Sequence, residues 1–321
     1  MMRILRWPAA WGSMAALMMA TNAAAQYPDR AVRLLVGFAA GGGTDVSARL
    51  IAKSLTEQWG KSVVVENKAG ADGNIATAEI ARARPDGYNL LVTTTSIVIT
   101  PVQQKQEYDP YTSFEPITLI GSSPSLVVVH PSMPVKNIKE LIALAKARPG
   151  TINFGSAGAG TVPYLATEMF VQETGLRMTH IPYKGGGPAV IGILSGETQL
   201  LFNSTAPLRT HVVAGKLRPI AVTAPKRLAI YPEVPTLIES GLPGFDTKVW
   251  FAAFAPAQTP KDIIQKLNTD FVKAIRSPEV RVTLEKQGNS VEGGSPDELA
   301  RLVRTGENAT GGHQQALRIG E

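Results

Sequence analysis

The sequence contains no cysteine among its 321 residues. Disulfide-bonded scaffolds, thiolate zinc sites, iron–sulfur clusters and cysteine nucleophiles are therefore all excluded. A bacterial lipid anchor is excluded as well, because the lipid is attached to a cysteine at the mature N-terminus. Any site in this chain must be built from oxygen, nitrogen and backbone groups.

Clusters of basic residues and long apolar runs are also missing. The net charge is +6, yet the 32 Lys and Arg residues are spread among 26 acidic ones and form no run of five or more. A nucleic-acid-binding protein would cluster its basic residues and interleave aromatic ones. We therefore expect no nucleic-acid partner. No apolar run approaches the roughly 20 residues of a membrane-spanning helix, so no direct membrane insertion is expected.

The N-terminus has the pattern of a secretory signal peptide. Arg3 and Arg6 form a positive region, residues 9–20 are uncharged and mostly apolar, and small residues precede a cleavage site between Ala25 and Gln26. Residues 1–25 would be removed on export. Without a lipid anchor, the mature chain would be lost from a cell that has no outer membrane. We therefore expect a Gram-negative periplasm, with an uncleaved anchor helix as the alternative.

The length predicts two domains, and the patterning predicts an α/β fold. Short apolar or β-branched runs alternate with amphipathic segments, as in βαβ units of a largely parallel sheet. In the first half we expect strands at 31–38, 62–66 and 89–94 and helices at 44–58 and 74–84. In the second half we expect strands at 126–129, 151–154, 180–182, 199–202 and 217–223 and helices at 137–147, 161–174, 188–194 and 206–213. Three Pro-initiated helices should follow residues 259, 277 and 295.

Two glycine-rich turns are built alike. Each follows a predicted strand that ends in Phe and leads to a Thr that opens a helix: FAAGGGT at residues 38–44 and FGSAGAGT at residues 154–161. Such a turn presents unpaired backbone N–H groups at the positive end of a helix dipole, which favours an anion. One loop lies in each half of the chain, so we expect a site between two domains. The alternative is that the glycines only make tight turns.

Other ligand classes fit the loops less well. GFAAGGGT at residues 37–44 has the length of a phosphate-binding P-loop, but Gly43 stands where that loop needs lysine. Neither loop matches G-x-G-x-x-G, so we expect no nucleotide and no cofactor. The four histidines show no metal-binding spacing, so no metal site is expected.

A serine hydrolase is the main enzymatic alternative. Ser156 lies on a predicted strand–turn–helix, as a nucleophile elbow would, but Phe154 replaces the first glycine of G-x-S-x-G. A triad in the order of that fold would require Asp246 and His313. We expect no catalytic residue.

Further polar residues lie at predicted strand ends and helix starts. Asp45 follows Thr44 in a first helical turn, where it would satisfy backbone N–H groups or contact a ligand. The polar run TTTS at residues 93–96, which includes Thr95 and Ser96, ends a strand at the edge of the sheet where ligands of open α/β sheets bind, and Asn203 follows another strand. Residues 183–189 form a third glycine loop that leads into a helix.

In its motifs the sequence resembles the tripartite tricarboxylate transporter receptor family, the Bug-type periplasmic solute-binding proteins. The motifs are YPDR at 27–30, GFAAGGGTD at 37–45, VENKAGA at 65–71, PDGY at 85–88, the glycines of 155–160, PYKG at 182–185, GKLR at 215–218, PEVPT at 232–236, and Trp250. Each motif is weak alone, but their order along the whole mature chain is specific.

The resemblance implies a two-domain periplasmic-binding-protein fold, type II-like, with mixed sheets flanked by helices and a ligand cleft between the domains that closes on a small carboxylate like a flytrap. It also implies a membrane permease of the tripartite tricarboxylate type as partner, and di- or tricarboxylates or aromatic acids such as terephthalate as ligands. Domain 1 would comprise residues 27–122 and 251–321, and domain 2 residues 123–250. We expect a monomer. A receptor that feeds a signalling sensor remains an alternative.

In such receptors the two glycine loops bind one ligand carboxylate through backbone amides and bridging waters. Tyr164 and Phe38 are candidate selectivity positions beside a ring or an alkyl chain. The expected ligand-binding residues are Phe38, Ala40, Gly41, Gly42, Gly43, Thr44, Asp45, Thr95, Ser96, Ser156, Ala157, Gly158, Gly160, Thr161, Tyr164 and Asn203.

Overall fold

The computed structural model describes residues 27–305, which fold into helices packed on a mixed β-sheet. The predicted signal peptide, its cleavage site and His313 lie outside these residues. The strands are β1 (Val32–Val36), β2 (Val63–Asn67), β3 (Asn89–Thr94), β4 (Phe114–Val129), β5 (Asn153–Ser156), β6 (Thr179–Pro182), β7 (Leu200–Ser204), β8 (Arg218–Val222), β9 (Lys248–Pro256) and β10 (Ser290–Val291). The helices are α1 (Gly43–Trp59), the 3₁₀ turn η1 (Ala71–Gly73), α2 (Asn74–Ala81), α3 (Ser96–Gln103), α4 (Ile138–Ala147), α5 (Val162–Thr174), α6 (Gly186–Leu194), α7 (Thr205–Val213), α8 (Lys261–Arg276), α9 (Pro278–Lys286) and α10 (Pro296–Thr305).

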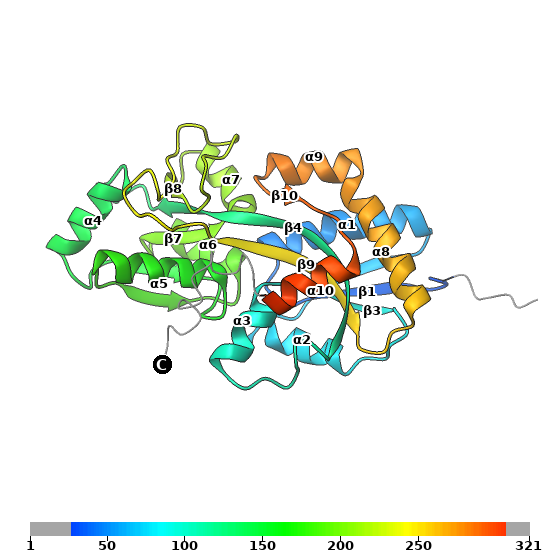
Figure 1. Cartoon of the computed structure of the whole chain (residues 1–321). Helices are drawn as coiled ribbons and strands as arrows, with labels where there is room; N and C mark the ends of the chain where they lie inside the picture. Colours follow the sequence, from blue (N-terminus) through cyan, green and yellow to red (C-terminus); the bar gives the residue numbers. More distant parts are fainter. Residues whose placement is uncertain (1–26, 306–321) are drawn as a thin grey trace, which may run out of the picture.

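Two lobes share this sheet. Figure 1 shows α4 to α7 and β7 to β8 on one side, α1, α2 and α8 to α10 on the other, and β4 and β9 running between them. We call the first group lobe 2, which also contains β5 and β6. The second group is lobe 1, which also contains β1 to β3, η1 and α3. The hydrogen-bonded order is β2-β1-β3-β9-β4-β7-β5-β6, with β8 and β10 paired to β4. The fold is therefore the mixed α/β arrangement that the sequence predicts.

Parallel pairing is confined to the outer strands of each lobe. β1 pairs in parallel with β2 and β3, and β5 does so with β6 and β7. β9 lies antiparallel between β3 and β4, and β4 pairs antiparallel with β7 and β8. The largely parallel sheet expected from βαβ alternation was therefore wrong for the central strands.

β4 belongs to both lobes. Along its first part, from Phe114 to Pro124, it pairs with β9, and from Ser125 onward it pairs with β7 and β8. Two irregularities interrupt its pairing with β9, beginning at Pro116 and Leu119. Proline is tolerated at such places because a bulge does not need its missing N–H. Two continuous strands therefore connect the lobes.

The core follows the alternation of side chains along the strands. In β1, Leu34 packs with α1 and α8 on one face, while its neighbour Leu35 packs with α2 and α3 on the other. In β4, the side chain of Val127 packs in the core on one face of the lobe 2 sheet, and that of its neighbour Leu126 packs in the core on the other face. Each lobe therefore has helices on both faces of its sheet, because successive strand residues point in opposite directions.

Most predicted elements exist, with shifted ends. The first strand covers only Val32–Val36, and α2 ends at Ala81, before the chain reaches Pro85. Helix α5 begins at Val162 because Thr161 has an extended backbone and forms the N-cap. Other differences are ends shifted by one or two residues.

Five described elements were missed wholly or in part, of which η1 and β10 have only three and two residues. The sequence predicts only residues 126–129 of the 16-residue β4, because Pro116, Gly121 and Pro124 resemble strand breaks. It predicts neither β9, a uniformly apolar strand without alternation, nor α3, whose interior contains Pro101.

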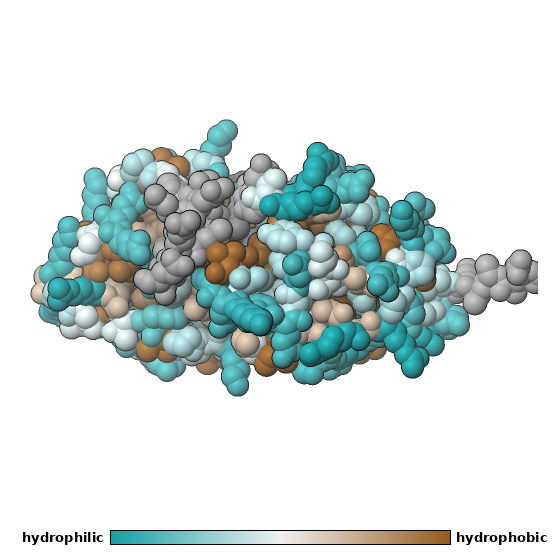
Figure 2. Space-filling model, turned by 60° about the horizontal axis from the view of Figure 1, so that its bottom comes forward, coloured by the Kyte–Doolittle hydropathy of each residue, from teal (hydrophilic) through white to brown (hydrophobic). Residues whose placement is uncertain are grey.

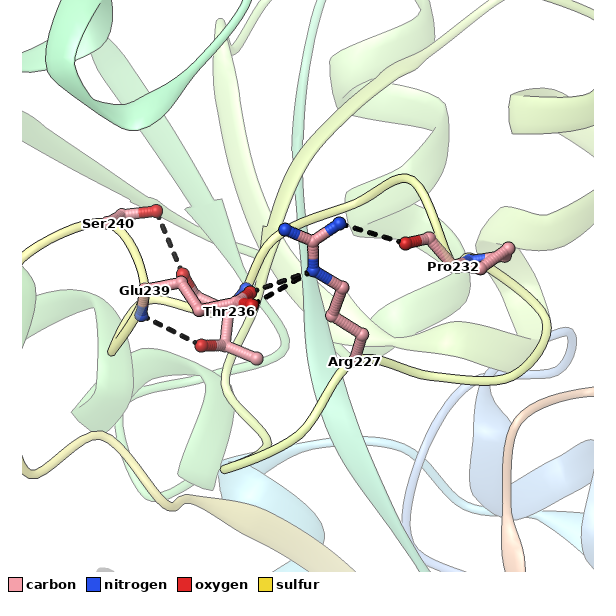
Figure 3. Close-up of polar contacts among 5 residues, drawn as sticks. All are labelled: Arg227, Pro232, Thr236, Glu239 and Ser240. Carbon is pink, nitrogen blue, oxygen red and sulfur yellow. Dashed lines mark hydrogen bonds and ion pairs between the residues drawn. The ribbon is translucent and has the colours of Figure 1, made fainter.

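A long connection between β8 and β9 is held by side chains (Figure 3). Arg227 donates to the Glu239 carboxylate at 2.9 and 3.1 Å and to the Pro232 carbonyl at 3.0 Å. Glu239 and Thr236 form a reciprocal cap, with the Thr236 amide 2.8 Å from the carboxylate and the Glu239 amide 2.9 Å from the Thr236 hydroxyl. Ser240 donates to the Thr236 carbonyl at 2.8 Å. The predicted PEVPT motif is therefore an ordered turn in lobe 2.

On the face that Figure 2 shows, most of the coloured residues are teal or white, and a brown patch lies near the middle of the molecule. Exposed large apolar side chains include Ile75 of α2 and Val102 of α3. Between residues 27 and 305, no helix has both the length and the apolar character needed to cross a bilayer.

Candidate anion-binding site

A small cavity lies between the two lobes. Its volume is about 40 Å³, enough for a few water molecules. It is lined by Phe38, Gly42, Gly43, Thr44, Thr94, Ala157, Thr161, Pro163, Gly186, Asn203, Ser204, Val249 and Phe251. None of these side chains carries a charge, so the polar character of the cavity comes from hydroxyl, amide and backbone groups.

Several helices begin at this cavity. The starts of α1, α5, α6 and α7 contribute lining residues, and α3 begins two residues after Thr94. Their N-cap residues are Gly42, Thr161, Gly185, Ser204 and Thr95, and none of them caps its helix with a side-chain hydrogen bond. Each helix start carries partial positive charge on its first N–H groups. Their convergence favours a negatively charged group in the cavity.

In the first glycine loop, the Asp45 carboxylate holds the backbone in place. It accepts hydrogen bonds from the Gly41 amide at 3.0 Å, from Arg49 Nε at 3.0 Å and from Asn67 Nδ2 at 2.9 Å. The same Asn67 amide group donates to the Phe38 carbonyl at 2.9 Å. Burial would raise the pKa of Asp45, but these donors outweigh it and hold the pKa below its usual value. Asp45 therefore fixes the conformation of the first glycine loop without itself lining the cavity.

The second glycine loop is shaped by Ser156 and Thr161. The Ser156 hydroxyl accepts from the Gly158 amide at 3.1 Å and lies 2.7 Å from Nε2 of His180. Thr161 donates its hydroxyl to the Gly158 carbonyl at 2.7 Å. Gly158 has a φ of +128°, which L residues with a side chain rarely adopt. Glycine is therefore required at this turn.

His180 belongs to an aromatic stack in lobe 2. Its ring lies 5.0 Å from Phe154 and 4.6 Å from Tyr164, measured between centroids. Burial lowers the pKa of His180. Tyr164, which the sequence analysis placed beside the ligand, packs in this stack and does not line the cavity.

The lobes touch each other around the cavity. The Ala39 amide donates to the Lys184 carbonyl at 3.1 Å, and the Gly160 amide donates to Oδ2 of Asp72 at 2.9 Å. Gly187 lies so close to the first glycine loop that an added Cβ would be 2.5 Å from the Ala40 carbonyl oxygen. The structure is therefore a closed arrangement of the two lobes.

Asn203 and Thr94 also line the cavity, and each forms hydrogen bonds with neighbouring residues at a helix start. Asn203 accepts from the Ser204 amide at 2.9 Å and donates to the Gly186 carbonyl at 3.2 Å, which ties the starts of α6 and α7 together. The hydroxyls of Thr94 and Ser96 are 3.0 Å apart.

The structure brings part of the predicted set together. Seven predicted residues line the cavity: Phe38, Gly42, Gly43, Thr44, Ala157, Thr161 and Asn203. The others lie nearby but outside its lining: Ala40 and Gly41 on the exposed turn, Asp45 behind it, Thr95 and Ser96 at the start of α3, and Ser156, Gly158, Gly160 and Tyr164 around the second loop. Ligand contact stays a prediction for all sixteen.

Six lining residues were missed: Thr94, Pro163, Gly186, Ser204, Val249 and Phe251. The third glycine loop already pointed to Gly186, and the polar run at the end of β3 pointed to Thr94. No sequence pattern indicated Val249 and Phe251 as lining residues, because they lie on β9, which was not predicted.

The profile of the tripartite tricarboxylate transporter family receptors, TctC, matches residues 47–317. The chain belongs to this family. BugT of Bordetella pertussis is 36% identical over 280 residues, which cover 86% of each chain. The structure of R. palustris Rpa4515 with adipate superimposes with a TM-score of 0.84 at 37% identity, covering 87% of this chain and 94% of that one. MatC from Rhodopseudomonas palustris with bound malate gives a TM-score of 0.83 at 31% identity, covering 87% and 97%.

This TctC chain is thus a periplasmic solute-binding receptor by family, and the predicted resemblance is confirmed. Receptors of this family bind small carboxylates. The solved receptors have the same two-lobed mixed α/β fold as the structure in Figure 1. Across residues 27–305, no group of three or more His, Asp or Glu side chains is arranged to hold a metal ion.

Proposed function

We propose that this receptor binds one small carboxylic acid in the cavity between its lobes and delivers it to a membrane permease of the tripartite tricarboxylate type. The observation that carries the proposal is the convergence of uncapped helix starts on a cavity without charged side chains. A carboxylate there would be stabilised by backbone N–H groups and helix dipoles. An arginine clamp is not needed.

The apolar part of the lining suits the carbon skeleton of such an acid. Phe38, Pro163, Val249 and Phe251 supply aromatic and aliphatic surface beside the helix starts. Two similar receptors were solved with adipate and malate, which are aliphatic diacids. We therefore propose a small aliphatic carboxylic acid as ligand. Terephthalate and other aromatic acids are the alternative, because Phe38 and Phe251 could flank a ring.

Binding would involve separation and closure of the lobes. A cavity of about 40 Å³ is the space left with the lobes in contact, so an acid of several carbons would enter while they are apart and hold them slightly wider when they close again. We propose that domain 1 (27–122 and 251–321) and domain 2 (123–250) rotate about β4 and β9, the two strands that cross between them. A ligand that contacts both domains stabilises the closed state through its differential affinity.

We further propose that the chain acts as a monomer in the periplasm after removal of residues 1–25. Secretion of the full-length gene product and N-terminal sequencing of the mature form test this. Residue Gln26 is the expected first residue.

A thermal-shift screen followed by calorimetry tests the ligand class. Malate, adipate, citrate and terephthalate are compared with glucose as a neutral control. An acid at about 100 times its Kd should add about 2.7 kcal/mol to the free energy of unfolding. A melting temperature raised by glucose and by none of the acids contradicts the proposal.

A serine hydrolase is the second candidate, because Ser156 lies 2.7 Å from His180. The expected triad partner Asp246 lines a different pocket, with Ser122 and Lys248, and His313 lies outside the described residues. Turnover of short p-nitrophenyl esters by the wild type and by Ser156→Ala decides between the two. Hydrolysis that S156A abolishes would favour the enzyme.

A further inference from the structure

Asp72 has an unusual backbone conformation next to the cavity. In the turn η1, Ala71 and Asp72 have φ angles of +46° and +57°, in the left-handed region where residues with side chains are uncommon. Gly73 follows, and a Cβ added to it would lie 3.3 Å from the Phe38 ring, which lines the cavity. The turn therefore lies directly behind one cavity wall.

The Asp72 carboxylate reaches from lobe 1 to the second glycine loop of lobe 2. Its Oδ2 accepts the Gly160 amide at 2.9 Å, and a Cβ added to Gly158 would lie 1.8 Å from its Oδ1. Gly158 follows the lining residue Ala157, and Gly160 precedes the lining residue Thr161. The carboxylate therefore occupies one backbone N–H group of the second glycine loop, two residues before α5 begins.

No cation compensates this charge within residues 27–305, where Asp72 forms no ion pair. Burial raises the pKa of Asp72, and the Gly160 amide only partly offsets this. The cavity itself has no charged lining. The Asp72 carboxylate thus lies, without an ion-pair partner among the described residues, beside a site whose other features favour anions.

We propose that Asp72 determines specificity at the proposed solute site, by lowering affinity more for each additional negative charge on the acid. The inference depends on the proposed function, since it concerns the acid bound there. Two charges repel each other strongly in a partly buried setting, whereas the neutral carbon chain is unaffected. A monocarboxylate meets this repulsion once, and a dicarboxylate of the same length meets it twice.

Matched acids test the charge effect. Hexanoate and adipate have six carbons each, and butyrate and succinate four, so each pair differs by one carboxylate. Calorimetry gives the Kd of all four acids for the wild type and for Asp72→Asn, which removes the charge but keeps an acceptor for Gly160. Asn also tolerates positive φ. We expect D72N to shift the ratio of affinities toward the diacid by roughly tenfold.

Two further variants separate charge from geometry. Asp72→Gly fits the positive φ and removes both the charge and the acceptor, so it should shift the ratio in the same direction. Asp262→Asn removes one exposed charge in the first turn of α8 and should leave the ratio unchanged. Melting curves without ligand establish that each variant is folded.

The outcomes are distinct. An unchanged ratio in D72N, or a shift in D72G alone, overturns the role of Asp72 and leaves the proposed function intact. An equal shift in D262N assigns the effect to net charge and also overturns it. Failure of all four acids to bind the wild type and D72N at millimolar concentration overturns the proposed function, and the inference with it.

Discussion

Gly187 of lobe 2 lies directly against the Ala40 carbonyl of lobe 1. A Cβ at Gly187 would be 2.5 Å from that oxygen and 3.2 Å from the carbonyl carbon of Gly41. The neighbours are backbone atoms, which cannot rotate away as a side chain can. The third glycine loop is therefore needed for the two lobes to approach this closely.

Gly187→Ala should weaken ligand binding by preventing this closure. Its control is Ala159→Val in the second glycine loop, which adds carbon atoms at an exposed position outside the cavity lining. We expect a loss of affinity of at least tenfold in G187A and a much smaller loss in A159V. Calorimetry with the acid that gives the largest thermal shift, and small-angle scattering with and without it, measure both effects. Equal losses in the two variants would contradict a steric cause.

The two glycine loops and the alternation of strands and helices could be predicted from sequence, because their signals are local. The FAAGGGT and FGSAGAGT motifs do lead into α1 and α5, and Gly43, Thr44 and Thr161 do line the cavity. Repeated glycines before a helix disfavour a continuing strand and permit the positive φ angles of a tight turn. Such motifs show where the loops lie along the chain, but they do not show how far apart the two loops lie in the folded protein.

The central strands and the contacts between lobes could not be predicted. β4 contains Pro116 and Pro124, which resemble breaks until the irregular pairing with β9 is known. The contact between Asp72 and Gly160 joins residues 88 positions apart, and no local pattern indicates it. Such pairings depend on tertiary packing that overrides local propensity.

Asp45→Ala should destabilise the fold. The Asp45 side chain is only 5% exposed, and its loss removes the acceptor of the Gly41 amide, the partner of Arg49 and one of the two acceptors of the Asn67 amide group. We expect a decrease of about 3 kcal/mol in the free energy of unfolding, measured in urea at pH 7. Glu57→Gln removes an exposed carboxylate 3.9 Å from Lys53 and should cost no more than about 0.5 kcal/mol. A similar cost for both variants would refute the positioning role.

The contribution of Asp45 should also depend on pH. Its pKa is lower in the folded chain than in the unfolded one, since Arg49, Gly41 and Asn67 outweigh burial. The stabilisation is therefore present above the unfolded pKa near 3.9 and is lost as the pH falls through the folded pKa. In urea titrations, the stability difference between the wild type and Asp45→Asn should decrease as the buffer is acidified below pH 4. A difference that grows in acid would contradict the assigned direction.

His180 should make stability sensitive to mild acid. Burial lowers its pKa in the folded chain, so the unfolded chain takes up a proton more readily. Its contribution is complete above the unfolded pKa of about 6.5 and decreases as the pH falls through the folded value. The melting temperature of the wild type should therefore fall between pH 7.5 and 5 by more than that of His180→Phe. His211→Gln, in the last turn of α7, should follow the wild type.

Filling the cavity should abolish binding without unfolding the chain. Ala157 lines the cavity, whereas Ala159 in the same loop is exposed. Ala157→Leu adds three carbons to a space of about 40 Å³, so the larger side chain and a ligand cannot both be accommodated. Ala159→Leu adds the same volume toward solvent and should bind normally. Calorimetry with the acid from the screen, after melting curves have established that both variants fold, measures the difference. Retained affinity in folded A157L would exclude this cavity as the solute site, because no binding mode inside it could tolerate the added side chain.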